Sequence, residues 1–180
     1  MKVLADPTAL SPTNGSDDEL QVIVETPAKS RNKFAFDPEQ GIFALKKTLP
    51  AGMEFPYDFG FVPKTEGGDG DPLDVLLLMD EPAFPGIAVK ARILGVIKGE
   101  QLDGKKKVRN DRLVAVAMAS QSYADVERVD DLPKKWLREI EMFFVHYHKL
   151  EGKEYRLLGC KGPKTAKRLL ASARRSKRRT

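Results

Sequence analysis

Short runs of apolar residues, separated by clusters of Gly, Pro, Asn and Asp, fill most of the first 160 residues of the chain. This spacing is typical of a small all-β barrel or sandwich. One run is longer than the rest, long enough to bend around a barrel. The strands that the pattern predicts are Leu20–Glu25, Lys33–Phe36, Ile42–Lys46, Asp74–Met79, the long Ile87–Lys98, Leu113–Ala119 and Tyr155–Cys160.

Two later stretches have the period of a helix instead. The first, predicted over residues 132–151, has Asp131 in position to cap it and Pro133 near its first turn. The second begins at Gly162-Pro163. We therefore expect a mainly β protein, a barrel with two C-terminal α-helices packed on its outside. The apolar stripe of the first helix is Trp136, Ile140, Phe143, Phe144 and Tyr147.

Length and composition favour one globular domain with short appendages. The 180 residues are 41% hydrophobic and 32% charged, which is enough to bury a core. Residues 1–19 are rich in Pro, Thr, Ser, Asn and Asp and are expected to form a flexible leader. We expect the barrel domain to cover residues 20–160 and a basic helix or tail to cover residues 161–180.

The chain has no feature of a membrane or secreted protein. Its longest uncharged apolar run, Val75–Met79, is far too short for a membrane span. The N-terminal residues contain no apolar core of a signal peptide. Cys160 is the single cysteine, which excludes an intrachain disulfide framework and fits a reducing cytoplasm. We expect a cytoplasmic protein that does not enter a membrane.

The net charge of +5 is unevenly distributed. Residues 161–180 contain nine of the 31 Lys and Arg residues and no acidic residue, so the rest of the chain is mildly acidic. A solvated helix end is the favoured interpretation of this tail, and attachment to nucleic acid or another polyanion stays open. The tail has no interleaved aromatic residues on which bases would stack.

The stretch Glu66–Met79, EGGDGDPLDVLLLM, carries the chemistry. Asp69, Asp71 and Asp74 lie within six residues, in a glycine-rich segment directly before an apolar strand. Carboxylates crowded in this way repel one another and usually require a divalent cation. Since no His or Cys lies nearby, hard oxygen ligands favour Mg²⁺ or Mn²⁺.

Two other structures are compatible with an acidic, glycine-rich segment, an EF-hand loop and a solvated acidic turn. An EF-hand loop fails, because Leu73 and Asp74 occupy positions where that loop needs a ligand and a glycine. A solvated acidic turn is the other alternative. Cations near strand ends favour a site for phosphoryl transfer to water, although no nucleotide-binding loop accompanies them. These cations are Lys33, Lys47 and Arg112.

The segment DGDPLDV, Asp69–Val75, resembles the signature of the soluble family I inorganic pyrophosphatases. The resemblance extends from about Leu20 to Ala171. The other segments that carry it are ETPAKSRNKF (Glu25–Phe34), FPYDFGFVP (Phe55–Pro63), DRLVAV (Asp111–Val116) and FFVHY (Phe143–Tyr147).

The resemblance implies a distorted five-stranded OB-like barrel that forms a homo-oligomer, often a hexamer. It also implies an enzyme that hydrolyses pyrophosphate to two phosphates with several Mg²⁺ ions, with Mn²⁺ possible. Asp71 would be the general base. Metal ions would be bound by Asp69, Asp74, Glu25 and Asp111, with Asp103 or Glu100. Substrate would be bound by Lys33, Lys47, Arg112, Tyr147 and His148. Arg112 would replace a lysine of the family.

Several positions depart from the family pattern, mostly on the substrate side. Three phenylalanines stand where the family has tyrosines. At three further positions, alanine replaces an acidic residue, lysine replaces an arginine that grips phosphate in a bidentate way, and histidine replaces a lysine. These losses leave a weakened or substrate-shifted phosphoanhydride hydrolase as an alternative, and a non-catalytic polyanion-binding barrel as another. The changed positions are Phe55, Phe59, Phe61, Ala35, Lys47 and His148.

The remaining candidates each have a plain structural explanation. Tyr147 is expected to be a core residue as readily as a ligand contact, because it lies on the apolar stripe. His146 and His148 face different sides of a helix and are expected at the surface or behind the substrate contacts. Cys160 is expected to be a small buried apolar residue. Lys105–Lys107 is expected to be a solvated hairpin tip.

Overall fold

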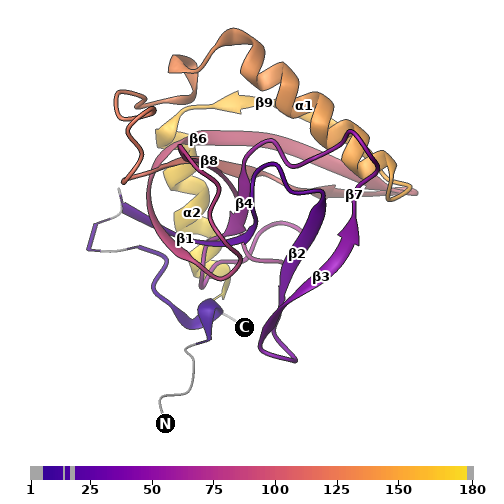
Figure 1. Ribbon diagram of the computed structural model, residues 1–180, viewed down its shortest axis with the longest axis horizontal. Helices are drawn as coiled ribbons and strands as arrows, with labels where there is room; N and C mark the ends of the chain where they lie inside the picture. Colours follow the sequence, from indigo (N-terminus) through magenta and orange to yellow (C-terminus); the bar gives the residue numbers. More distant parts are fainter. Residues whose placement is uncertain (1–5, 14, 17–18, 178–180) are drawn as a thin grey trace.

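The computed structural model describes residues 6–13, 15–16 and 19–177. It contains one seven-stranded sheet, a separate two-stranded hairpin and two α-helices (Figure 1). The elements in chain order are the 3₁₀-helix η1 (Pro7–Ala9), β1 (Glu19–Thr26), β2 (Asn32–Asp37), β3 (Ile42–Thr48), β4 (Asp58–Phe61), β5 (Asp74–Leu78), β6 (Ala88–Asp103), β7 (Lys106–Arg109), β8 (Arg112–Ala117), η2 (Val129–Asp131), α1 (Lys134–Lys149), β9 (Glu154–Lys161) and α2 (Pro163–Lys177).

Five strands close the large sheet into a ring. The order β1–β4–β5–β8–β6 returns to β1, because β6 also pairs with β1. Only the β5–β8 pair in this ring is parallel, and the ring is uneven rather than a regular barrel. β7 and β9 extend the sheet from β6, and β2 pairs with β3 alone. The expected distorted five-stranded barrel with two helices is confirmed.

The long strand β6 holds the ring together. Its first part pairs with β1, its middle with β8, and its last part with β9 and β7. The pairing with β8 is irregular between Ile93 and Gly95, and that with β9 between Lys98 and Gly99. These irregularities bend the strand. A Cβ on Gly95 would lie 2.4 Å from the carbonyl oxygen of Lys161, so glycine is required there.

Alternate residues of β5 belong to two separate cores. Val75 and Leu77 pack in the cluster that includes Ala166 and Leu170 of α2, whereas Leu76 and Leu78 belong to the cluster of α1. Because both faces of the strand are buried, its sequence is continuously apolar rather than alternating. Acidic residues are therefore confined to the loop before this strand and to its first position.

Two strands and one helix cap differ from the sequence prediction. β4 is only four residues long and contains Gly60, and β7 lies in the basic segment expected to be solvated, so neither has an apolar pattern. The cap prediction for Asp131 is wrong, since its carboxylate accepts the N–H groups of Glu127 and Arg128 instead. Helix α1 begins at Lys134, behind Pro133, without a side-chain cap.

Both ends of the described chain contact the body. Lys64 N–H donates to the carbonyl of Thr8 (3.2 Å), and Arg174 of α2 donates to Thr13 Oγ1 (2.8 Å). Parts of the predicted leader (1–5, 14 and 17–18) and residues 178–180 of the predicted tail lie outside the described residues. In the part of the chain that the structure describes, no helix is long and apolar enough to cross a membrane.

Candidate active site

A cleft of about 840 Å³ opens between the loop before β5, the β2 strand, the β6–β7 hairpin and the end of α1. It brings together residues that are more than 100 positions apart in the chain. Lys47 and Asp111 are not in its lining. The residues predicted to be catalytic, metal-binding or substrate-binding that do line it are Glu25, Lys33, Asp69, Asp71, Asp74, Arg112, Tyr147 and His148. The changed positions Ala35, Phe55, Phe59 and Phe61 line it as well.

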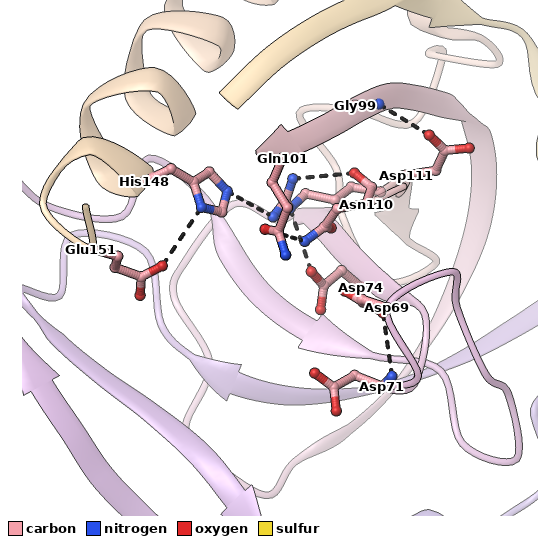
Figure 2. Close-up of polar contacts among 10 residues, drawn as sticks. Asp69, Asp71, Asp74, Gly99, Gln101, Asn110, Asp111, His148 and Glu151 are labelled. Carbon is pink, nitrogen blue, oxygen red and sulfur yellow. Dashed lines mark hydrogen bonds and ion pairs between the residues drawn. The ribbon is translucent and has the colours of Figure 1, made fainter. Parts of the chain in front are cut away.

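One wall of the cleft is acidic. Asp69 and Asp71 lie in the loop before β5, and Asp74 is the first residue of that strand (Figure 2). The loop is closed by a hydrogen bond from Gly67 N–H to the Asp71 carbonyl (2.7 Å), and Gly70 adopts a positive φ of 90°. Asp71 N–H donates to Asp69 Oδ1 (3.3 Å). The glycines thus turn three carboxylates toward one space.

Burial disfavours the charged form of two carboxyl groups in this wall. It raises the pKa of Glu25 to about 7, although the N–H of Phe36 donates to its Oε1 (2.8 Å). Burial also raises the pKa of Asp74 to about 6, opposed by Arg112 and reinforced by Asp69. Carboxylates in this state gain stability from a bound cation.

The donor set fits a magnesium ion that keeps part of its water shell. Among the residues that the structure describes, no three acidic, His or Cys side chains converge into a complete metal cage. Mg²⁺ commonly binds proteins through one or two carboxylates, with water and phosphate as its other ligands. An open wall of carboxylates beside a wide cleft is compatible with that mode of binding.

Arg112 is a buried cation behind this wall. Its side chain is 3% exposed, and its Nε lies 3.4 Å from Asp74 Oδ2. Its guanidinium also packs 4.0 Å from the centre of the Phe144 ring. The family resemblance implies a substrate contact for Arg112, and in the structure its ion-pair partner is Asp74.

His148 completes the contacts of this arginine. Nη2 of Arg112 lies 3.3 Å from His148 Nε2. Because a guanidinium only donates, this ring nitrogen must accept, which leaves the proton of the neutral ring on Nδ1, 3.6 Å from Glu151 Oε2. Burial lowers the pKa of His148, and Arg112 adds to the decrease. His148 is therefore held neutral in the lining of the cleft, buried rather than at the surface.

Two lysines lie over the aromatic ring of Tyr147. Nζ of Lys47 is 3.8 Å from the ring centre and Nζ of Lys33 is 5.4 Å away. Lys47 also forms an ion pair with Glu151 (2.5 Å). Burial raises the pKa of Tyr147 to about 12, so its hydroxyl stays protonated. Lys33 and Tyr147 line the cleft, whereas Lys47 lies behind the Tyr147 ring and outside the lining, so Lys33 is the lysine of this pair that directly faces an oxyanion in the cleft.

Sequence reasoning did not identify Glu151. Its carboxylate pairs with Lys47 and lies 3.6 Å from His148 Nδ1, and the interaction with His148 is the main cause that lowers its pKa to about 2. The only sequence signal was its position three residues after His148, the spacing of neighbours on a helix surface. A single acidic residue at a helix end is too common to indicate a role.

The three phenylalanines that replace tyrosines line the cleft but are buried. Phe55, Phe59 and Phe61 are 2–6% exposed. Phe55 packs against the ring of Tyr147, with ring centres 5.8 Å apart. This part of the cleft is therefore an apolar floor, and Tyr147 supplies a hydroxyl beside it.

The acidic residues after the long strand are placed differently from the carboxylate wall. The Asp111 carboxylate accepts the N–H of Gly99 (3.0 Å) and pairs with Arg109 (2.6 Å), directed away from Asp71 (Figure 2). It is not in the lining of the main cleft but lines an adjoining cavity of about 230 Å³, which Asp69 and Asp74 also line. The backbone of Asp103 lies at the end of β6, beside Lys106, and its side chain is outside the described part.

Comparison with known proteins agrees with this architecture. The family model "Inorganic pyrophosphatase" matches residues 22–178. Two relatives with that name, from Synechocystis and Haloferax volcanii, are 39% and 36% identical, covering 79% and 83% of this chain and 82% and 83% of their own.

Solved structures extend the match to the whole fold. The inorganic pyrophosphatase of Thermus thermophilus superposes with a TM-score of 0.89 at 28% identity, covering 97% of this chain and 99% of that one. The enzyme of Coxiella burnetii gives 0.84 at 32% identity, covering 93% and 99%. Fold, cleft and sequence therefore agree that this chain belongs to the inorganic pyrophosphatase family.

Proposed function

We propose that this protein hydrolyses inorganic pyrophosphate to two phosphates, with Mg²⁺ as its metal. One observation carries the proposal: four carboxylates line a cleft that is also lined by Lys33 and Tyr147, with Lys47 packed against the Tyr147 ring. A dianionic phosphate group and its cations require both kinds of surface in one place. Membership of the pyrophosphatase family supports the same substrate.

The metal-binding residues in this proposal are Asp69, Asp74 and Glu25. Their carboxylate oxygens suit Mg²⁺, several ions of which would be used, and Mn²⁺ is a second candidate. The bound metal would lower the pKa of a water molecule and offset charge on the substrate. Asp111 and Asp103, considered from the sequence, are not included, because Asp111 bonds to Gly99 and Arg109 and the side chain of Asp103 is outside the described residues.

The protein groups then have distinct tasks. Asp71 lines the cleft beside Asp69 and is proposed to accept the proton of the attacking water. Lys33, Lys47 and Tyr147 would hold the phosphate oxygens. Arg112 and His148, expected to contact substrate, would act mainly by fixing Asp74. Their own polar contacts are with each other, with Asp74, with Glu151 and with the carbonyl of Asn110.

The test is release of phosphate from pyrophosphate by the purified protein, measured with Mg²⁺ and with a chelator in its place. We expect rapid release with Mg²⁺ and none with the chelator. Release that is insensitive to the chelator would contradict the metal role. No release from folded protein would contradict the function.

A weakened or substrate-shifted hydrolase is the second candidate. It is favoured by the apolar floor that Phe55, Phe59 and Phe61 form in the cleft. Each hydroxyl that would otherwise bind phosphate contributes about 1–3 kcal/mol. The same assay with tripolyphosphate separates the candidates: a higher kcat/KM for tripolyphosphate than for pyrophosphate identifies a shifted enzyme.

Assembly and location are also part of this proposal. We propose a cytoplasmic homo-oligomer, with a hexamer as the favoured state. Exposed apolar side chains on several elements support assembly, including Met142 on α1, Leu45 on β3 and Phe84. Light scattering after size-exclusion chromatography measures the mass, and a monomer would contradict this part.

A further inference from the structure

The end of the cleft opposite Asp71 is formed by two neutral amides. Gln101 lies on β6, and Asn110 lies just before β8. Asn110 Nδ2 donates to Gln101 Oε1 (3.2 Å), and Asn110 is only 8% exposed (Figure 2). The same end of the cleft is lined by the cations Lys106, Lys107 and Arg109.

The acidic neighbours of both amides are directed elsewhere. Successive side chains on a strand point to opposite faces. Glu100, next to Gln101, is outside the cleft lining and pairs with Lys107 (3.7 Å). Asp111, next to Asn110, bonds to Gly99 N–H and Arg109. The amides at positions 101 and 110 therefore face the cleft, and the carboxylates at the neighbouring positions 100 and 111 do not.

Amides in place of carboxylates make the Gln101–Asn110 wall a poor site for a divalent cation. The affinity of an oxygen site for a divalent cation depends on the number of charged ligands. The amide pair contributes no charge, and its internal hydrogen bond occupies one acceptor oxygen, while the adjacent Lys and Arg side chains repel cations. Amide N–H groups and lysines instead suit the oxygens of an anion.

We propose that the Gln101–Asn110 wall contacts phosphoryl oxygens directly, without a divalent cation of its own. The cleft therefore holds fewer metal ions than it would with carboxylates at these two positions. This inference rests on the proposed function, since it assigns the metal ions to the opposite, acidic wall. The two residues thus determine how the substrate is oriented: one end faces the metal ions and the other faces amides and lysines.

The test counts Mn²⁺ bound per chain, by calorimetric titration and by electron paramagnetic resonance, without substrate. Asn110→Asp alone and Gln101→Asp with Asn110→Asp are compared with the wild type. We expect the double variant to bind one more Mn²⁺ per chain than the wild type does. The single variant should bind this additional Mn²⁺ more weakly than the double variant does. Asn110→Asp is nearly isosteric and serves if the double variant does not fold.

Asp111→Asn is the matched control. It removes the carboxylate of the residue next to Asn110, and this carboxylate points away from the cleft. We expect its Mn²⁺ count to equal that of the wild type. An unchanged count in both wall variants, or a loss of one Mn²⁺ in Asp111→Asn, would overturn the inference while leaving the proposed function intact. If the wild type binds no Mn²⁺ at all, the proposed function and this inference fail together.

Discussion

At the scale of single residues, Arg112 is the cation that pairs with the acidic wall of the cleft. It is buried, pairs with Asp74 and is packed against Phe144. We expect Arg112→Leu to lower the free energy of unfolding by about 3 kcal/mol, because the partly buried Asp74 loses its partner. Urea unfolding at pH 7 measures the change.

The control for this variant is Arg128→Ala, which removes an arginine from an exposed pair with Asp130. Exposed pairs contribute little, so its free energy of unfolding is expected to change by less than about 1 kcal/mol. Equal effects of the two substitutions would show that the burial of Arg112 has no energetic consequence.

Asp80 gives a pH-dependent prediction outside the cleft. Its carboxylate accepts the N–H of Gln121 (2.7 Å), the N–H of Ser122 and the hydroxyl of Ser120, and these donors lower its pKa from 3.8 to about 2. A lowered pKa in the folded state stabilises the protein above pH 4, and this contribution is lost as the pH falls toward 2.

We therefore expect wild type to be more stable than Asp80→Asn at pH 5 and the difference to shrink between pH 4 and pH 2. Urea unfolding midpoints of both proteins across this range measure it. A difference that stays constant with pH would contradict the role of these hydrogen bonds.

At the scale of elements, β6 depends on glycine where it meets β8 and β9. A Cβ at position 95 would approach the Lys161 carbonyl oxygen at 2.4 Å and Val129 at 2.8 Å. Backbone cannot move aside as a flexible side chain can, so Gly95→Ala should lower the free energy of unfolding by about 2–3 kcal/mol. Gly162→Ala, with no atom within 4 Å of the added Cβ, is the control and should cost less than about 1 kcal/mol.

Thermal and urea unfolding of both glycine variants check this prediction. A Gly95 variant as stable as the Gly162 variant would mean that β6 can shift away from β9 without cost. The bend of β6 would then not depend on the close approach at this position.

The elements also show how far the sequence determines the site. The apolar period predicted both helices and most strands, and the DGDPLDV segment predicted the acidic wall. Strand β4 was missed because four residues with a glycine carry too little pattern. Gln101 and Asn110 were missed because their place in the cleft depends on a one-residue register that only the folded sheet defines.

At the scale of the whole molecule, the ring assembles a site from distant segments. Glu25 comes from β1, Asp71 from the loop before β5, Arg112 from β8 and Tyr147 from α1. No local pattern predicts that Lys47 lies over the ring of Tyr147, 100 positions later. The family resemblance implies that both residues hold the substrate, and the fold brings them into contact with each other.

The most direct test of the account compares Asp71→Asn with the wild type in phosphate release from pyrophosphate at saturating Mg²⁺. Loss of the proton acceptor should lower kcat about 10²–10⁴-fold. Asp130→Asn, the same chemical change at an exposed carboxylate outside the cleft lining, should leave kcat unchanged. A folded Asp71→Asn protein with the kcat of the wild type would contradict the assignment of Asp71 as the general base.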